Sequence, residues 1–270
     1  MSRISKAFER GKAFVTFITC GDPDLDTTKK TVLAAIKNGA DIVELGIPFS
    51  DPTAEGPVIQ AANARALAGG ITADKIFDMV RSLRKETDAP LLFMTYANVI
   101  YSYNYGAEGE SGKEGFLKKC AETGIDGIIL PDVPFEEKEE FNDVCRENDV
   151  DLISLIAPTS EDRITEIASE ARGFIYVVSS LGVTGVRSEI TTDIDAMVRL
   201  VRESTDTPCA VGFGISSPDQ AAEMAAKSDG AIVGSAIMKI IAEHGTDAPE
   251  AVGAYVRKMA EAVHGVHTDN

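Results

Sequence analysis

The sequence is poor in histidine, and its few histidines lie near one end. The 270 residues include three, His244, His264 and His267, and all of them follow the last apolar run that is typical of a β-strand. Serine hydrolase triads and most zinc sites need an imidazole in the body of the fold. The sequence therefore excludes most hydrolase and zinc chemistry, and we interpret His264 and His267 as part of a frayed polar terminus.

Other catalytic signatures are also missing. No lysine lies inside an apolar strand-like run, where burial would lower its pKa, so a Schiff-base aldolase is disfavoured. The sequence has no G-x-x-x-x-G-K-[ST] loop and no strand-linked G-x-G-x-x-G motif, which are the usual marks of nucleotide chemistry. Carboxylates, tyrosines and hydroxyl groups remain as candidate catalysts.

Cysteine pairs and membrane spans are absent too. The four cysteines form no C-x-x-C motif and are scattered through apolar or helical stretches, which predicts free thiols in a reducing compartment. No apolar run approaches the ~18 residues of a membrane span. The run Ala13–Cys20 imitates a signal peptide, but it is short and leads into an acidic turn, so we interpret it as a buried strand. We expect a cytoplasmic protein.

Positive charge is scarce. The sequence has 26 lysines and arginines against 43 acidic residues, which gives a net charge of −17. Such a surface repels nucleic acid and anionic lipid, so neither is expected as a partner. An anionic ligand would have to be held by local partial charges, such as helix N-termini and backbone N–H groups.

What the sequence does contain is a regular alternation of strand and helix patterns. Amphipathic stretches separate eight short apolar runs, and no linker interrupts the series. This pattern predicts a single-domain (β/α)8 barrel over residues 1–270 with an N-terminal helix, and a doubly wound open sheet is the alternative. The eight runs cover residues 14–20, 41–47, 91–96, 126–131, 151–157, 174–180, 209–215 and 231–236.

Two of the connections that follow strands are unusually long. They follow the second and sixth strands, from Pro48 to about Thr72 and from Leu181 to about Thr191. The loops at the carboxyl ends of the strands form the active face of such a barrel. We therefore expect both long loops to act as lids over the site.

One acidic residue interrupts a strand that otherwise reads as fully buried. Alternation along 42–47 places Ile42 and Glu44 on one face and Val43 and Leu45 on the other. If the second pair faces the helices, Glu44 points into the barrel, where burial raises the pKa of a carboxyl group toward that of a general acid or base. The alternative is a structural ion pair with an arginine.

Glycine turns and polar residues follow several strands. Gly212–Ser216, Gly234–Ser235 and Gly182–Gly185 are candidates for a phosphate site, because glycine lets backbone N–H groups approach an anion and Ser235 can open a short helix. Plain turn chemistry is the alternative. Four polar residues near strand ends could line a pocket or serve in packing and capping: Tyr96, Asn98, Asp132 and Tyr176.

These features together resemble the α subunit of tryptophan synthase, over nearly the whole chain. Seven motifs in the same order carry the resemblance: TCGDP at 19–23, ELGIPFSDP at 44–52, YAN at 96–98, PDVP at 131–134, GVTG at 182–185, GFGISS at 212–217 and GSAI at 234–237. The resemblance implies retro-aldol cleavage of indole-3-glycerol phosphate to indole and glyceraldehyde 3-phosphate. It further implies an α2β2 assembly, in which a β subunit that holds pyridoxal phosphate receives the indole. No cofactor is implied in this chain, and no metal.

The resemblance also assigns residues. Glu44 corresponds to the acid/base that protonates the indole ring, with Tyr176 in the same pocket, and Glu55 to the acid that accepts the indole N–H. The remaining assignments are the substrate-binding residues Phe17, Tyr96, Thr184 and Phe213, the phosphate-binding residues Gly185, Gly214, Gly234 and Ser235, and the partner-facing residues Pro48, Asp51, Asn98 and Pro134.

One position departs from the better-known pattern. The first lid of the family commonly reads Asp-Pro-x-Ala-Asp-Gly-Pro, and here the second acid is Glu55. The added methylene moves the carboxylate by roughly one C–C bond length, and a misplacement of ~1 Å can cost ~100-fold in rate. Two alternatives therefore stand beside the lyase subunit. One is a weakly catalytic barrel that mainly binds and activates the β subunit, and the other is a stand-alone lyase that releases indole.

Overall fold

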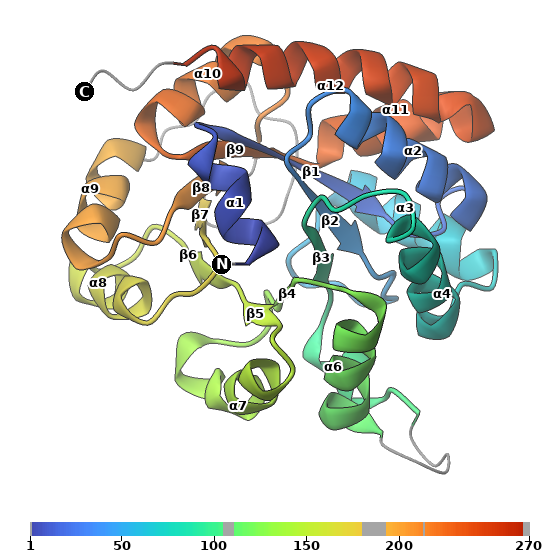
Figure 1. The fold of residues 1–270 in the computed structure, drawn as a ribbon, viewed down its shortest axis with the longest axis horizontal. Helices are drawn as coiled ribbons and strands as arrows, with labels where there is room; N and C mark the ends of the chain where they lie inside the picture. Colours follow the sequence, from blue (N-terminus) through green and yellow to red (C-terminus); the bar gives the residue numbers. More distant parts are fainter. Residues whose placement is uncertain (1, 105–110, 180–192, 213, 267–270) are drawn as a thin grey trace.

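The computed structural model describes residues 2–104, 111–179, 193–212 and 214–266. The nine strands in these ranges form one parallel sheet, and helices lie around it (Figure 1). The strand order is β5-β4-β3-β2-β1-β9-β8-β7-β6, so paired strands are consecutive in the chain except where β1 meets β9. The bounds are β1 Ala13–Thr19, β2 Ile42–Gly46, β3 Leu91–Met94, β4 Gly127–Ile129, β5 Asp151–Leu152, β6 Ser154–Ile156, β7 Ile175–Val178, β8 Cys209–Gly212 and β9 Gly230–Val233.

The fifth strand of the barrel is interrupted at Ile153. Its first half, β5, pairs with β4, and its second half, β6, pairs with β7. The Ile153 N–H still donates to the Ile128 carbonyl at 2.9 Å, so the chain itself joins the two ends of the sheet. The predicted (β/α)8 barrel is confirmed. The doubly wound open sheet is excluded because the first strand, β1, pairs with the last, β9, and the two ends of the sheet, β5 and β6, are parts of one interrupted strand.

Helices surround the sheet. Several begin at a side chain that caps the first turn, such as Asp24 before α2, Thr72 before α4 and Ser217 before α10. The bounds are α1 Arg3–Glu9, α2 Leu25–Lys37, α3 Pro57–Ala68, α4 Ala73–Leu83, α5 Ala97–Tyr101, α6 Gly112–Thr123, η1 Phe135–Glu137, α7 Glu139–Glu147, α8 Glu161–Ser169, α9 Ile194–Ser204, α10 Pro218–Lys227, α11 Ser235–His244, η2 Gly245–Asp247 and α12 Ala248–His264.

Two segments differ from the expectation. The long connection after β2 contains the helix α3, so only its first part, up to Gly56, is a loop. The supposed frayed terminus is wrong for His264, which is the last residue of the 17-residue helix α12 and whose Nε2 lies 2.7 Å from Asp41 Oδ2. In Figure 1, α12 lies along α2, which explains how its end reaches Asp41. His267 lies outside the described residues.

The strands form the centre of the core. Each residue of β1, β2, β3, β4, β7, β8 and β9 is buried, because helices cover the outer face and side chains fill the interior. All four cysteines are free, as predicted, and the structure places each of them in a buried position. Within the described ranges, no helix has the length and apolar character to cross a membrane.

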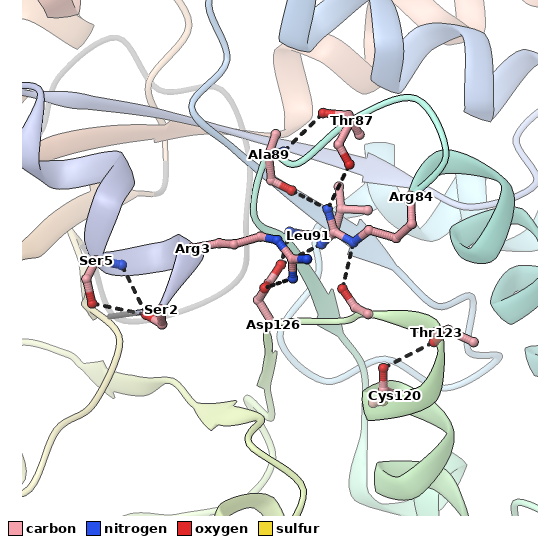
Figure 2. Close-up of polar contacts among 11 residues, drawn as sticks. Ser2, Arg3, Ser5, Arg84, Thr87, Ala89, Leu91, Cys120, Thr123 and Asp126 are labelled. Atoms are coloured by element: carbon pink, nitrogen blue, oxygen red, sulfur yellow. Dashed lines mark hydrogen bonds and ion pairs between the residues drawn. The ribbon is translucent and has the colours of Figure 1, made fainter.

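The amino ends of the strands are closed by α1 and a charged network (Figure 2). Arg3 of α1 and Arg84 after α4 both contact Asp126, at 3.0 and 2.5 Å, and Asp126 also accepts the Leu91 N–H at 2.9 Å. Arg84 further donates to the Gly124 and Ala89 carbonyls at 2.7 and 2.6 Å. These contacts stabilise the amino-terminal end of the barrel. The active site of such a barrel is expected at the carboxyl ends of the strands.

Candidate active site

Glu44 lies inside the barrel. It pairs in register with Phe17 of β1, and the two side chains line the same small cavity of about 30 Å3. The other walls of this cavity come from β3, β7, β9 and the loops that follow β8 and β9, together with Ile59 of α3. The alternation along β2 therefore predicted the direction of this side chain correctly.

The environment of Glu44 is apolar. The residue is fully buried, and neither of its carboxylate oxygens has a hydrogen-bond partner among the described residues. The arginine ion pair that the sequence left open is not found in this part of the chain. Burial raises the pKa of Glu44 to about 8, so the group holds a proton at neutral pH. A protonated carboxyl group in a dry cavity is suited to act as a general acid.

Two aromatic rings flank Glu44 because two strand glycines leave room for them. A Cβ at Gly46 would lie 2.5 Å from Phe17 Cζ, and a Cβ at Gly212 would lie 2.5 Å from the Tyr176 hydroxyl oxygen. Burial, and then the nearby Glu44 carboxylate, raise the pKa of Tyr176 well above its ordinary value. This role of the two glycines was not predicted, although a glycine within a strand pattern signals a close approach.

The phosphate candidates lie at one side of this cavity. Gly214, Gly234 and Ser235 all line it, and Gly214 adopts a φ of +91° that favours glycine. Gly234 precedes the ten-residue helix α11, which no side chain caps within the described chain, so its first backbone N–H groups are available to an anion. Thr184, Gly185 and Phe213 lie outside the described residues, as does the expected second lid.

Glu55 lies in a second buried group, next to the first. Its carboxylate accepts a hydrogen bond from Asn63 of α3 at 2.6 Å and another from the Tyr96 hydroxyl. The Tyr96 ring packs on Phe49, with 5.1 Å between the ring centroids. Burial raises the pKa of Glu55 to about 7, although both hydrogen bonds oppose the shift. Glu55 is not among the residues that line the Glu44 cavity, and α3 links the two groups because Ile59 does line it.

Asp132 has a capping role in the structure. It accepts the Ala97 N–H at 3.0 Å, so it caps α5, as one alternative allowed.

A larger cavity of about 220 Å3 lies elsewhere in the molecule. It is lined by η1, α7, α8 and the interrupted strand, and it contains none of the candidate catalytic residues. We therefore place the candidate site inside the barrel and not in this larger cavity.

The residues expected to face a partner follow three adjacent strands. Asp51 comes after β2, Asn98 after β3 and Pro134 after β4, and all three are exposed. Pro48 is buried, so it offers no surface to a partner in this structure. Tyr101, on the same short helix as Asn98, is 43% exposed, which is unusual for a large aromatic side chain in this protein.

Comparisons with known proteins agree with the geometry. The family model described as tryptophan synthase alpha chain matches residues 4–265. The tryptophan synthase alpha chain of Lacticaseibacillus casei is 45% identical over 263 residues, which is 97% of this chain and 96% of that protein.

Solved structures are similar over the whole fold. The tryptophan synthase alpha chain of Legionella pneumophila has a TM-score of 0.86 at 36% identity, with 99% of each chain covered. A structure of the tryptophan synthase α2β2 complex of Pyrococcus furiosus has a TM-score of 0.82 at 33% identity, covering 92% of this chain and 98% of that one. The chain therefore belongs to the tryptophan synthase alpha chain family, a family of carbon–carbon lyases in tryptophan biosynthesis.

Proposed function

We propose that this chain cleaves indole-3-glycerol phosphate inside the barrel, with Glu44 as the proton donor. The observation that carries the proposal is a fully buried carboxyl group without a hydrogen-bond partner in the described chain, in a cavity that also contains the start of α11. A buried polar group left unsatisfied is costly, and such groups concentrate where chemistry needs them. The Glu44 oxygens, which have no partner among the described residues, can contact a substrate atom.

The reaction needs only proton transfers. Glu44 gives its proton to the ring carbon that carries the glycerol phosphate chain. The C–C bond to that chain then breaks, and its electron pair returns to the indole ring. The hydroxyl group on the departing carbon gives its proton to the Glu44 carboxylate left by the first step and becomes the aldehyde of glyceraldehyde 3-phosphate, so Glu44 is protonated again. Because the cleavage involves no net oxidation or reduction of the substrate, this chain requires no redox cofactor for the step.

Glu55 and α11 supply the two other interactions. The Glu55 carboxylate accepts the indole N–H, since an ionised carboxylate has about four acceptor sites and Asn63 and Tyr96 use two. The first N–H groups of α11, together with Gly214 and Ser235, bind the phosphate. This arrangement satisfies the need for local partial charges in a chain of net charge −17.

A β subunit that holds pyridoxal phosphate is the proposed partner and recipient of indole, in an α2β2 assembly. The exposed Asp51, Asn98 and Pro134 at the carboxyl ends of β2, β3 and β4 form the proposed contact face. The Pyrococcus furiosus structure supports this proposal, because it describes mutual activation of an α2β2 complex.

Indole formation from indole-3-glycerol phosphate tests the function. We expect slow turnover by the isolated chain and faster turnover after a β subunit is added. Binding of the β subunit without any indole formation from indole-3-glycerol phosphate would favour the activating barrel. Turnover that a β subunit neither binds nor changes would favour the stand-alone lyase.

A further inference from the structure

The side chain of Asn63 contacts both ends of the loop that carries Glu55. Its Nδ2 donates to Glu55 Oε2 at 2.6 Å and to the Phe49 carbonyl oxygen at 3.4 Å. An amide nitrogen has two donors, so both contacts can form at once. Asn63 is 3% exposed and sits on the rigid helix α3. The loop between residues 49 and 55 is therefore fastened to α3 through one side chain.

The contact matters because a glutamate is harder to position than an aspartate. Its side chain has one more rotatable bond, so it loses more rotamer freedom when it is fixed. Asn63 fixes Oε2, and the Tyr96 hydroxyl, which also accepts the Ala54 N–H at 3.3 Å, holds the carboxylate from a second direction. Together they limit how far the longer side chain can move.

The same contact favours the charged form of the carboxyl group. Burial penalises the ionised form of Glu55, and the amide donor of Asn63 opposes this penalty. Only the ionised form is an acceptor on both oxygens. Asn63 therefore favours the ionised form of Glu55 and also fixes the position of its carboxylate.

We propose that Asn63 is the positioning residue of Glu55, and that it holds the carboxylate ionised and at a fixed depth in the site. This inference rests on the proposed function in one respect, namely that Glu55 receives the indole N–H. The contact of Asn63 with the carboxylate is independent of it.

The test compares two amide-to-leucine variants of α3. Asn63→Leu removes the donor to the carboxylate, whereas the control Gln60→Leu removes a donor to the Glu55 backbone carbonyl, which lies 2.6 Å from Gln60 Nε2. The full chain is labelled with ¹³C at glutamate side-chain carboxyls, and the Glu55 signal is assigned by its loss in Glu55→Gln. The titration midpoint of Glu55 is then measured alongside the pH dependence of kcat/KM.

We expect the midpoint of Glu55 to rise by about one pH unit in Asn63→Leu and to stay unchanged in Gln60→Leu. The acid limb of kcat/KM should move with it, with a loss of up to about tenfold below the new midpoint. An unchanged midpoint in a folded Asn63→Leu would overturn the proposal. So would a uniform loss of activity at all pH values without any shift.

A second variant covers the case in which Asn63→Leu does not fold. Asn63→Asp keeps the shape of the side chain and places a second carboxyl group against Glu55, so the pair should share a proton and the upper midpoint should rise further. A Glu55 titration that Asn63→Asp leaves unchanged would contradict the contact. The NMR titration needs no turnover, so a chain that forms no indole would refute the proposed function and still test the role of Asn63.

Discussion

The hydroxyl group of Tyr176 occupies the space directly beside Gly212. A Cβ at this glycine would lie 2.5 Å from the hydroxyl oxygen and 2.6 Å from Cε1 of the ring. Both residues lie within buried strands, β7 and β8, so neither backbone can move away easily. The position of the Tyr176 ring beside Glu44 therefore depends on the absence of a Cβ atom at residue 212.

Gly212→Ala should displace the Tyr176 ring. We expect a loss of about 1–3 kcal/mol in the free energy of unfolding from overpacking, and a fall in kcat/KM of up to ~100-fold if the ring moves by ~1 Å. Urea unfolding and steady-state kinetics measure the two effects. In a Tyr176→Leu background the added cost of Gly212→Ala should shrink, because the ring is gone. Equal costs in both backgrounds would show that the ring is not what the methyl group displaces.

The two buried acids predict a narrow pH optimum. Glu55 must be ionised to accept the indole N–H, so kcat/KM should rise with pH through the pKa of about 7. Glu44 must hold its proton, so kcat/KM should fall as pH rises through about 8. The initial rate of indole formation across pH 5.5–9.5, a range of ~4 units, measures both limbs. Glu55→Gln should remove the acid limb and keep the basic one, and an acid limb unchanged in this variant would contradict the assignment.

The contact between His264 and Asp41 predicts a small pH-dependent stability. The side-chain hydrogen bond to Asp41 raises the pKa of His264, so the protonated form is favoured in the folded chain. The stabilisation is present below the unfolded pKa near 6.5 and is lost as pH rises through the folded pKa. Because the imidazole is 41% exposed, we expect less than about 1 kcal/mol.

His264→Gln should therefore lower Tm by about 1–3 °C near pH 6 and leave it unchanged near pH 9. Differential scanning calorimetry at the two pH values measures this. His244→Gln is the matched control, since no carboxylate contact of His244 is found in the described chain. A His264→Gln effect of equal size at both pH values would show that packing, and not the ion pair, is lost.

Much of the barrel follows from local patterns. The strands lie within the eight predicted apolar runs or overlap them. The period of two along β2, with Val43 and Leu45 taken to face the helices, predicted that Glu44 points into the barrel. The break at Ile153 could not be predicted, because it arises where one strand changes its hydrogen-bonding partners from β4 to β7. Sequence periodicity carries no information about which neighbour a strand finds.

The helices α3 and α12 were missed for different reasons. The start of α3 follows a segment rich in Asp, Pro and Gly that resembles a loop, and two of the four buried residues of α3, Ala62 and Ala66, are small. The helix α12 had a readable pattern, with Val252, Val256, Met259 and Val263 on one face, so His264 could have been placed at a helix end.

The site was only partly predictable. Glu44, Gly234 and Ser235, which line the cavity, could be proposed from the sequence because each stands out within its own segment. Asn63 carries no such signal, since its contact with Glu55 spans eight residues and forms only when the loop folds back on α3. Interactions of this kind depend on tertiary geometry that no local pattern records.

The role of Glu44 also makes a prediction about stability that serves as a control. Burial raises the pKa of this carboxyl group to about 8, above its unfolded value of 4.5, so stability falls as pH rises between these values. Glu44→Gln is neutral at all pH values and nearly the same size. Its unfolding free energy should therefore equal or exceed that of the natural chain near pH 8.5. A less stable variant at that pH would show that the carboxyl group is held by partners.

The most direct measurement is the single-turnover rate of indole formation by Glu44→Gln, with a β subunit present and excess enzyme over substrate. If Glu44 donates the proton to the indole ring, the rate should fall by about 10³-fold or more, while phosphate-dependent substrate binding stays within a few fold. A rate within about tenfold of the natural chain would contradict the assignment of Glu44 as the general acid.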